Sequence, residues 1–189
     1  KDNKGIIIRE DGLYSNNKLI YSKVRKRNLL GDHNLYNVAA TLLVCNILNL
    51  DLDSVSNYID SFESLEHRME KVGIFKGITF YNDSIATIPS ATINCIKSIP
   101  NIKTIIIGGM DRGLDLSSLV EYLYKDENIN TCIFLKDTGY KIKEELEKLG
   151  TNKNLINAID MKNAVENAYK YTKEGEACAL SPAAASYNV

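Results

Sequence analysis

The fold of this chain is decided by the stretch Phe80–Pro89, which reads FYNDSIATIP. Its first residues are typical of a β-strand, and the polar residues Asn82, Asp83 and Ser84 stand where that strand would end. After Pro89 the apolar residues recur with the spacing of a helix. A strand that runs through polar residues into a helix places side chains at the carboxyl edge of a sheet, where open α/β folds bind ligands.

A second strand delivers a similar end to the same edge. Residues 105–107 are three isoleucines, and Gly108–Gly113, which reads GGMDRG, follows them. Arg112 on this glycine-containing turn suits bidentate binding of a carboxylate or a phosphate. The alternative, which stays open, is that Arg112 is a surface residue on a mobile loop. We expect this edge to form half of an active site, with the other half outside the chain.

Beyond about residue 69, strands and helices alternate. The predicted strands are 69–75, 78–82, 103–108, 131–135, 154–158 and 177–180, and the predicted helices are 88–98, 116–125, 139–149 and 161–173. Regular alternation implies right-handed crossovers and a mostly parallel, Rossmann-like α/β sheet with helices on both faces. The first two strands, which only Gly77 separates, are expected to pair as a hairpin at one edge.

The beginning of the chain follows a different pattern. Short strands with turn signals between them precede a helix up to about Leu48 and a second helix from Ser54. Asp32 or Asn34 can cap the first of these helices. We therefore predict two domains, 1–64 and 65–189, which meet at a junction within residues 63–68.

Composition narrows the classes of partner. The formal net charge is -1, which argues against a mainly electrostatic nucleic-acid or membrane partner. No apolar run approaches the roughly 18 residues of a membrane helix, and no apolar signal segment follows the first residues. The four cysteines lie far apart in apolar runs, as expected of buried free thiols in a reducing cytoplasm. The first residue is not Met, and we expect the chain to be a fragment.

Several further residues are candidates for binding, and each has a structural alternative. Asp83 at a strand end can accept hydrogen bonds from a ribose diol, whereas Ser84 and Thr87 can equally cap the following helix. Asn37 lies one turn into a helix, where its amide can pair with an adenine edge. Arg68 can reach a phosphate, or it can join the two domains through a glutamate.

Taken together and in order, these segments resemble the Mur ligase family, most closely its glutamate-adding members. The motifs that carry the resemblance are GDHNLYN at 31–37, HRME at 67–70, YNDSIAT at 81–87, GGMDRG at 108–113 and LSPAAAS at 180–186. The family has three domains. The resemblance implies that 1–64 is the end of the central ATP-binding domain and that 65–189 is most of the C-terminal Rossmann-like domain, truncated at its end.

The resemblance also implies two sets of site residues. The nucleotide-binding set is Asn37 at the adenine, Arg68, and Asp83 at the ribose. The glutamate-binding set is Thr87, Arg112 and Ser186. In such ligases the carboxylate of UDP-N-acetylmuramoyl-L-alanine accepts the γ-phosphoryl group of ATP, and the amine of the incoming glutamate then displaces phosphate. ATP and Mg²⁺ are the implied cofactors, and we expect a cytoplasmic monomer without a nucleic-acid or membrane partner.

Three departures from the family pattern limit what can be carried over. The phosphate-binding Gly-Lys-Thr/Ser loop and the magnesium ligands are absent, so we expect no catalytic or metal-binding residues here and no activity of the isolated chain. Ile85 stands where many members have Lys, and Ile88 where many have Asn, which leaves open another acceptor such as L-glutamate. The chain also stops before a following Phe-rich segment. From another class, a non-catalytic Rossmann-like nucleotide-binding domain stays possible on fold alone.

Overall fold

The structure is a computed structural model that describes residues 5–185. The chain divides into two compact units, Lys1–Ser64 and Leu65–Val189. Each unit has its own sheet and its own apolar core.

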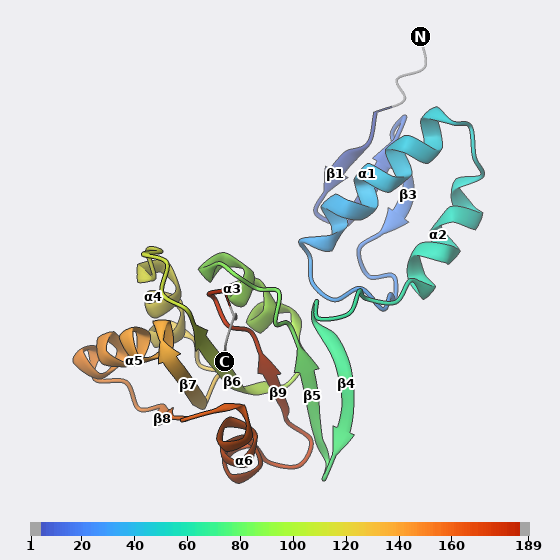
Figure 1. Cartoon of the computed structure of the whole chain (residues 1–189). Helices are drawn as coiled ribbons and strands as arrows, with labels where there is room; N and C mark the ends of the chain where they lie inside the picture. The colour runs from blue at the N-terminus through green and yellow to red at the C-terminus, as the bar shows by residue number, and fades with distance from the viewer. Residues whose placement is uncertain (1–4, 186–189) are drawn as a thin grey trace. The chain divides into compact units, whose positions relative to one another are not determined.

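The first unit is a small antiparallel sheet followed by two helices (Figure 1). Its elements are β1 (Ile7–Arg9), β2 (Gly12–Ser15), β3 (Lys18–Ser22), α1 (Asn34–Ile47) and α2 (Leu52–Ser61). The core of this unit is built around Leu13, Tyr21 and Leu42, which are almost fully buried. The Tyr21 hydroxyl donates a 2.7 Å hydrogen bond to Asp60 at the end of α2, which fastens that helix to β3.

The caps of these helices differ from the sequence expectation. Neither Asp32 nor Asn34 caps α1, because His33 occupies the N-cap position and no side chain caps the helix. Asn34 instead donates to the Leu30 carbonyl at 2.7 Å. Helix α2 does have a side-chain cap, since Asp51 accepts from the Asp53 and Ser54 amides. Hydrogen bonds from Ser54, first from its hydroxyl and then from its amide, lower the pKa of Asp51.

The second unit contains a six-stranded sheet in the order β4-β5-β9-β6-β7-β8. Its elements are β4 (Glu70–Phe75), β5 (Ile78–Asn82), α3 (Pro89–Ser98), β6 (Ile102–Gly109), α4 (Ser117–Lys125), β7 (Thr131–Asp137), α5 (Thr138–Leu149), β8 (Asn154–Asn157), α6 (Met161–Tyr171) and β9 (Ala177–Leu180). The pairs from β5 to β8 are all parallel, whereas β4 runs antiparallel to β5. The predicted α/β class with a mostly parallel sheet is confirmed.

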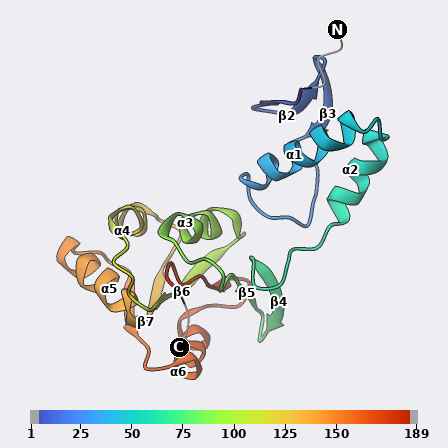
Figure 2. The ribbon, with the colours of Figure 1, turned by 45° about the horizontal axis from the view of Figure 1, so that its top comes forward.

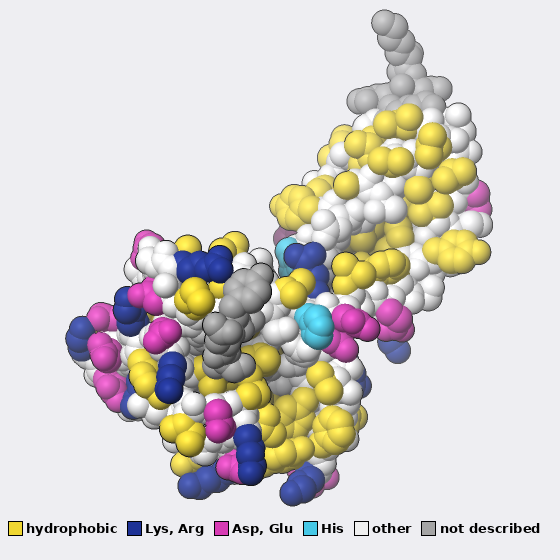
Figure 3. All heavy atoms as spheres, viewed as in Figure 1, with side chains coloured by type: hydrophobic (Ala, Val, Ile, Leu, Met, Phe, Trp, Pro, Cys, Tyr) yellow, Lys and Arg dark blue, Asp and Glu magenta, His cyan; other side chains and the backbone are white. Residues whose placement is uncertain are grey.

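The predicted hairpin between β4 and β5 is also confirmed. Its two turn residues, Lys76 and Gly77, both have positive φ angles, 51° and 77°. A turn of this kind matches the twist of the strands that it joins. Strand β4 forms one edge of the sheet and exposes Val72, Ile74 and Phe75, and apolar side chains gather on this side of the unit in the space-filling view (Figure 3).

Helices cover both faces of this sheet (Figure 2). On one face, α6 packs through Ala164 and Ala168 onto Ile106 and Ile133. On the other face lie α3, α4 and α5, which contact one another in that order. Because alternate residues of a strand point to opposite faces, the apolar run of β6 supplies both layers, and this explains why it shows no polar alternation.

The sequence predicted no membrane helix and four buried free thiols. Within residues 5–185, no helix has both the length and the apolar character needed to cross a membrane. All four cysteines are free thiols. Cys95, Cys132 and Cys178 are buried, as predicted, whereas Cys45 on α1 is only half-buried.

Candidate functional site

Strand β9 lies between β5 and β6, and all three run parallel. Their carboxyl ends therefore meet at one edge of the sheet. Three backbone hydrogen bonds continue this contact beyond the strands: Asp83 donates to Leu180 at 2.8 Å, Ser181 to Ile106 at 3.0 Å, and Met110 to Ala185 at 2.8 Å. We call residues 82–88, 108–113 and 180–185 the carboxyl rim.

Asp83 is the buried carboxylate of the carboxyl rim, with only 5% of its surface exposed. Its Oδ1 accepts the Met69 amide proton at 3.1 Å, and its Oδ2 accepts the Ser181 hydroxyl at 2.8 Å. Burial raises the pKa of Asp83, although the hydrogen bonds from Ser181, Met69 and Cys95 and the nearby charge of Arg68 oppose this rise. An ionised carboxylate has about four lone-pair sites, so the two oxygens retain accepting capacity for a ligand hydroxyl.

Arg68 lies on an exposed turn that is fastened to the carboxyl rim. Its neighbours His67 and Met69 have positive φ angles, 64° and 45°, which non-glycine residues adopt only where their surroundings hold them. The Asn82 amide meets the His67 ring nitrogen at 2.8 Å, and the Ile85 amide donates to the His67 carbonyl at 3.3 Å. Arg68 is thus placed beside Asp83 by backbone geometry.

Thr87 is exposed directly before α3. The alternative that Ser84 or Thr87 caps α3 is wrong, because Ile88 is the N-cap residue and no side chain accepts from the first turn. Ile85 and Ile88 on either side of Thr87 are about half exposed, 47% and 49%. The surface next to Thr87 is therefore apolar.

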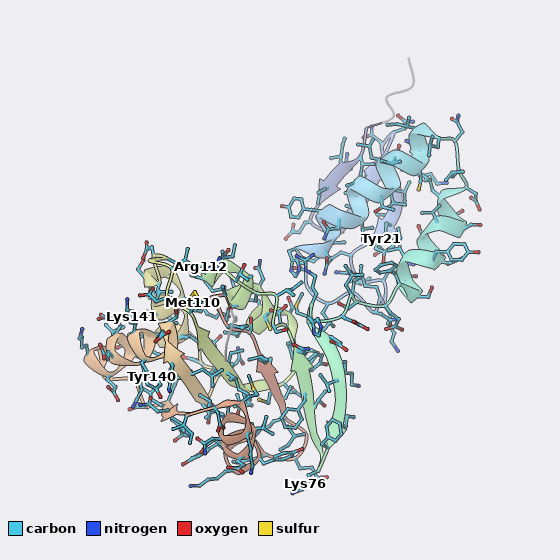
Figure 4. The ribbon with its side chains drawn as sticks, viewed as in Figure 1. Tyr21, Lys76, Met110, Arg112, Tyr140 and Lys141 are labelled. Atoms are coloured by element: carbon cyan, nitrogen blue, oxygen red, sulfur yellow. The ribbon has the colours of Figure 1, made fainter. Side chains whose placement is uncertain are left out.

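Arg112 follows β6 on an exposed turn. The preceding Asp111 accepts the Gly113 amide at 3.0 Å and forms an ion pair with Lys141 of α5. The Lys141 ammonium, through its hydrogen bond, lowers the pKa of Asp111. Figure 4 shows Arg112, Met110 and Lys141 at one end of the unit, with Lys76 of the hairpin turn at the opposite end.

Glycines permit the close contacts that build this part of the carboxyl rim. Gly108 has a φ of 131°, and a Cβ on it would lie 2.4 Å from the Leu135 carbonyl oxygen. A Cβ on Gly109 would lie 2.7 Å from the Ala185 carbonyl oxygen. The two glycines therefore allow β6 to approach both β7 and the segment after β9.

Two predicted site residues do not lie at the described carboxyl rim. Asn37 belongs to the first unit, where it is exposed on α1 and donates to Asn34 at 2.8 Å. Ser186 lies outside the described residues. The structure thus brings Arg68, Asp83, Thr87 and Arg112 to one edge of one sheet.

The described residues offer nothing suited to a metal ion by themselves. Within 5–185, no three His, Cys, Asp or Glu side chains come together in a way that could hold a metal ion.

The polar residues behind Asp83 were not predicted from the sequence. Thr92 and Ser181 are both fully buried, and the Thr92 hydroxyl lies 3.0 Å from the Ser181 hydroxyl. A signal was present, because Thr92 interrupts the apolar face of the helix predicted over 88–98. The ion pair between Asp111 and Lys141 was also missed, since 30 residues separate the two in sequence.

A Rossmann-like sheet whose carboxyl edge gathers an arginine turn, a buried carboxylate and a glycine-containing arginine loop is typical of enzymes that bind anionic small molecules. A family profile described as "Mur ligase, glutamate ligase domain" matches residues 67–184, and the chain belongs to this family. The resemblance inferred from the motifs is confirmed.

Curated relatives make the comparison more specific. The UDP-N-acetylmuramoylalanine–D-glutamate ligase of Caldanaerobacter subterraneus is 32% identical over 186 residues, which cover 98% of this chain and 41% of that protein. The ligase of the same name from Oenococcus oeni is 35% identical over 161 residues and is covered to 36% of its length. The chain thus spans about two fifths of the length of these relatives.

Solved structures agree at the level of the fold. The MurF ligase of Thermotoga maritima in complex with ADP matches 94% of this chain and 41% of its own, with a TM-score of 0.63 and 19% identity. At this identity the likeness extends to the fold alone.

Proposed function

We propose that this chain is part of an ATP-dependent ligase that adds D-glutamate to UDP-N-acetylmuramoyl-L-alanine in peptidoglycan synthesis. The observation that carries the proposal is the match of 98% of the chain to a ligase of that name. In this proposal Leu65–Val189 is the C-terminal domain and Lys1–Ser64 is the end of the central ATP-binding domain. The enzyme acts in the cytoplasm as a monomer, on small molecules and without a nucleic-acid or membrane partner.

The carboxyl rim supplies the acceptor half of the proposed site. Arg112 and Thr87, with Ser186 beyond the described residues, hold the carboxylates of the incoming glutamate. An arginine on a short turn is suited to this task because its planar guanidinium group can donate two parallel hydrogen bonds to a carboxylate. Holding the amine in line for attack is an orientation effect, which contributes about 7–11 kcal/mol of barrier reduction when the geometry is good.

Three residues are assigned to the nucleotide in this proposal. Asn37 contacts the adenine, Arg68 the phosphates, and Asp83 the ribose. The exposure of Asn37 and Arg68 and the remaining accepting capacity of Asp83 are compatible with these roles. In this proposal magnesium and the phosphate-binding loop are not supplied by this chain, which covers 41% of the length of its relative, so the isolated chain is inactive.

The experiment is a phosphate-release assay on the full-length protein. We expect release only when ATP, UDP-N-acetylmuramoyl-L-alanine and glutamate are all present. Screening both enantiomers of glutamate and a panel of other amino acids decides the acceptor, because the exposed Ile85 and Ile88 make the surface beside Thr87 apolar. Release that does not depend on any amino acid would contradict the proposal.

A further inference from the structure

A buried chain of hydroxyl groups stands behind the Asp83 carboxylate. The Ser181 Oγ lies 2.8 Å from Asp83 Oδ2 and 3.0 Å from the Thr92 Oγ1. The Thr92 hydroxyl also donates to the Ser181 carbonyl oxygen at 3.2 Å. Ser181 and Thr92 are 0% exposed, so neither can touch a ligand.

The direction of these hydrogen bonds follows from their chemistry. An ionised carboxylate can only accept, so the single Ser181 proton points to Asp83. The one proton of the Thr92 hydroxyl is then donated to Ser181, either to its carbonyl oxygen or to its Oγ, so Thr92 is bound to Ser181 in both cases. The arrangement joins the ends of β5 and β9 to α3, three elements that are distant in sequence.

Each oxygen of the Asp83 carboxylate therefore has its own hydrogen-bond donor. The Met69 amide holds Oδ1 and the Ser181 hydroxyl holds Oδ2. Cys95 also forms a hydrogen bond to this carboxylate. With a donor on each oxygen, the carboxylate cannot rotate without losing a hydrogen bond. Because removing a donor to a buried charge costs more than removing a neutral pair, the Ser181 hydroxyl matters both for the orientation of Asp83 and for its charged form.

We propose that Ser181, supported by Thr92, is a positioning residue that orients the Asp83 carboxylate toward the ribose of the nucleotide. This inference rests on the proposed function and deepens it. It gives the LSPAAAS segment a second task, in nucleotide recognition, besides the proposed contact of Ser186 with glutamate.

The test compares Ser181→Ala with the wild type in the full-length ligase, using ATP and 2′-deoxy-ATP as the two probes. We expect the KM for ATP to rise about tenfold, the consequence of losing one hydrogen bond to a charged group. We also expect the ratio of kcat/KM for ATP to that for 2′-deoxy-ATP to decrease. The kcat and the KM for glutamate stay within about twofold of the wild-type values.

Thr172→Val is the matched control. It breaks another buried hydrogen bond between two hydroxyls, since the Thr172 hydroxyl donates to that of Thr104 at 2.7 Å, at the other end of β6. We expect it to lower the melting temperature without changing the ribose preference. The same change of preference in Thr172→Val would overturn the inference, because it would show a general effect of lost stability.

Thr92→Val is the second test variant, to be used if Ser181→Ala does not fold. It removes the hydroxyl behind Ser181 at nearly constant volume, and we expect the same change in smaller measure, about threefold. A wild-type enzyme without glutamate-dependent phosphate release would overturn the proposed function. An active wild type in which Asp83→Asn loses the ribose preference, while Ser181→Ala and Thr92→Val keep it, would overturn this inference alone.

Discussion

The Met69 amide donates to Asp83 Oδ1 at 3.1 Å, which joins the turn that carries Arg68 to the end of β5. The bond crosses 14 residues of sequence and is buried. It makes Asp83 a structural residue as well as a candidate for binding, and its two tasks can be separated by experiment.

The stability of the chain should depend on pH through Asp83. Burial raises its folded pKa above the unfolded value, which is about 3.9. Its stabilising contribution is therefore fully present below the unfolded pKa and is lost as pH rises through the raised folded pKa. We expect Asp83→Asn to gain stability relative to the wild type across this window, as measured by urea unfolding at a series of pH values. A difference between the two proteins that is constant across the window would contradict this expectation.

Gly108 should not tolerate a side chain. An alanine there would adopt a φ of 131° and place its Cβ 2.4 Å from the Leu135 carbonyl oxygen. We expect Gly108→Ala to lower the free energy of unfolding by about 3 kcal/mol, from backbone strain and overpacking together. Gly150→Ala is the control, since Gly150 has a φ of 71° and open space around it, so only strain of about 1 kcal/mol is expected. Equal losses in the two variants would refute the packing explanation.

Thiol labelling should distinguish one cysteine from the other three. Burial raises the pKa of Cys132 and of Cys178 to about 12 and raises that of Cys95 well above its usual range. Because the thiolate is the reactive form, we expect iodoacetamide to modify Cys45 first in the native chain, as read by peptide mass spectrometry. Fast native labelling of Cys132 would be inconsistent with the buried β7.

The sequence predicted the second unit well because its signals are local. Apolar strands such as β6 and β7 and the amphipathic helices between them can be read from periodicity, and the predicted bounds agree closely with the structure. The caps of α1 and α3 were predicted wrongly, since cap identity depends on the path of the preceding loop.

The candidate site was predictable only in part. Asp83 and Arg112 stand at strand ends, which the strand–helix pattern marks. The partnership of Ser181 with Asp83 spans 98 residues and follows from β9 lying between β5 and β6. Sequence periodicity carries no information about that strand order, so the hydroxyl chain behind Asp83 could be found only from the structure.

We propose that the carboxyl rim binds the acceptor amino acid, and substitution of Arg112 is the most direct test. The measurement is the KM for glutamate of the full-length Arg112→Ala enzyme, with Lys125→Ala as the control because Lys125 pairs with Glu121 along α4. We expect the KM for glutamate to rise by about tenfold or more in Arg112→Ala, while the KM for ATP stays within about twofold and Lys125→Ala behaves as the wild type. A folded, active Arg112→Ala enzyme with an unchanged KM for glutamate would contradict the claim.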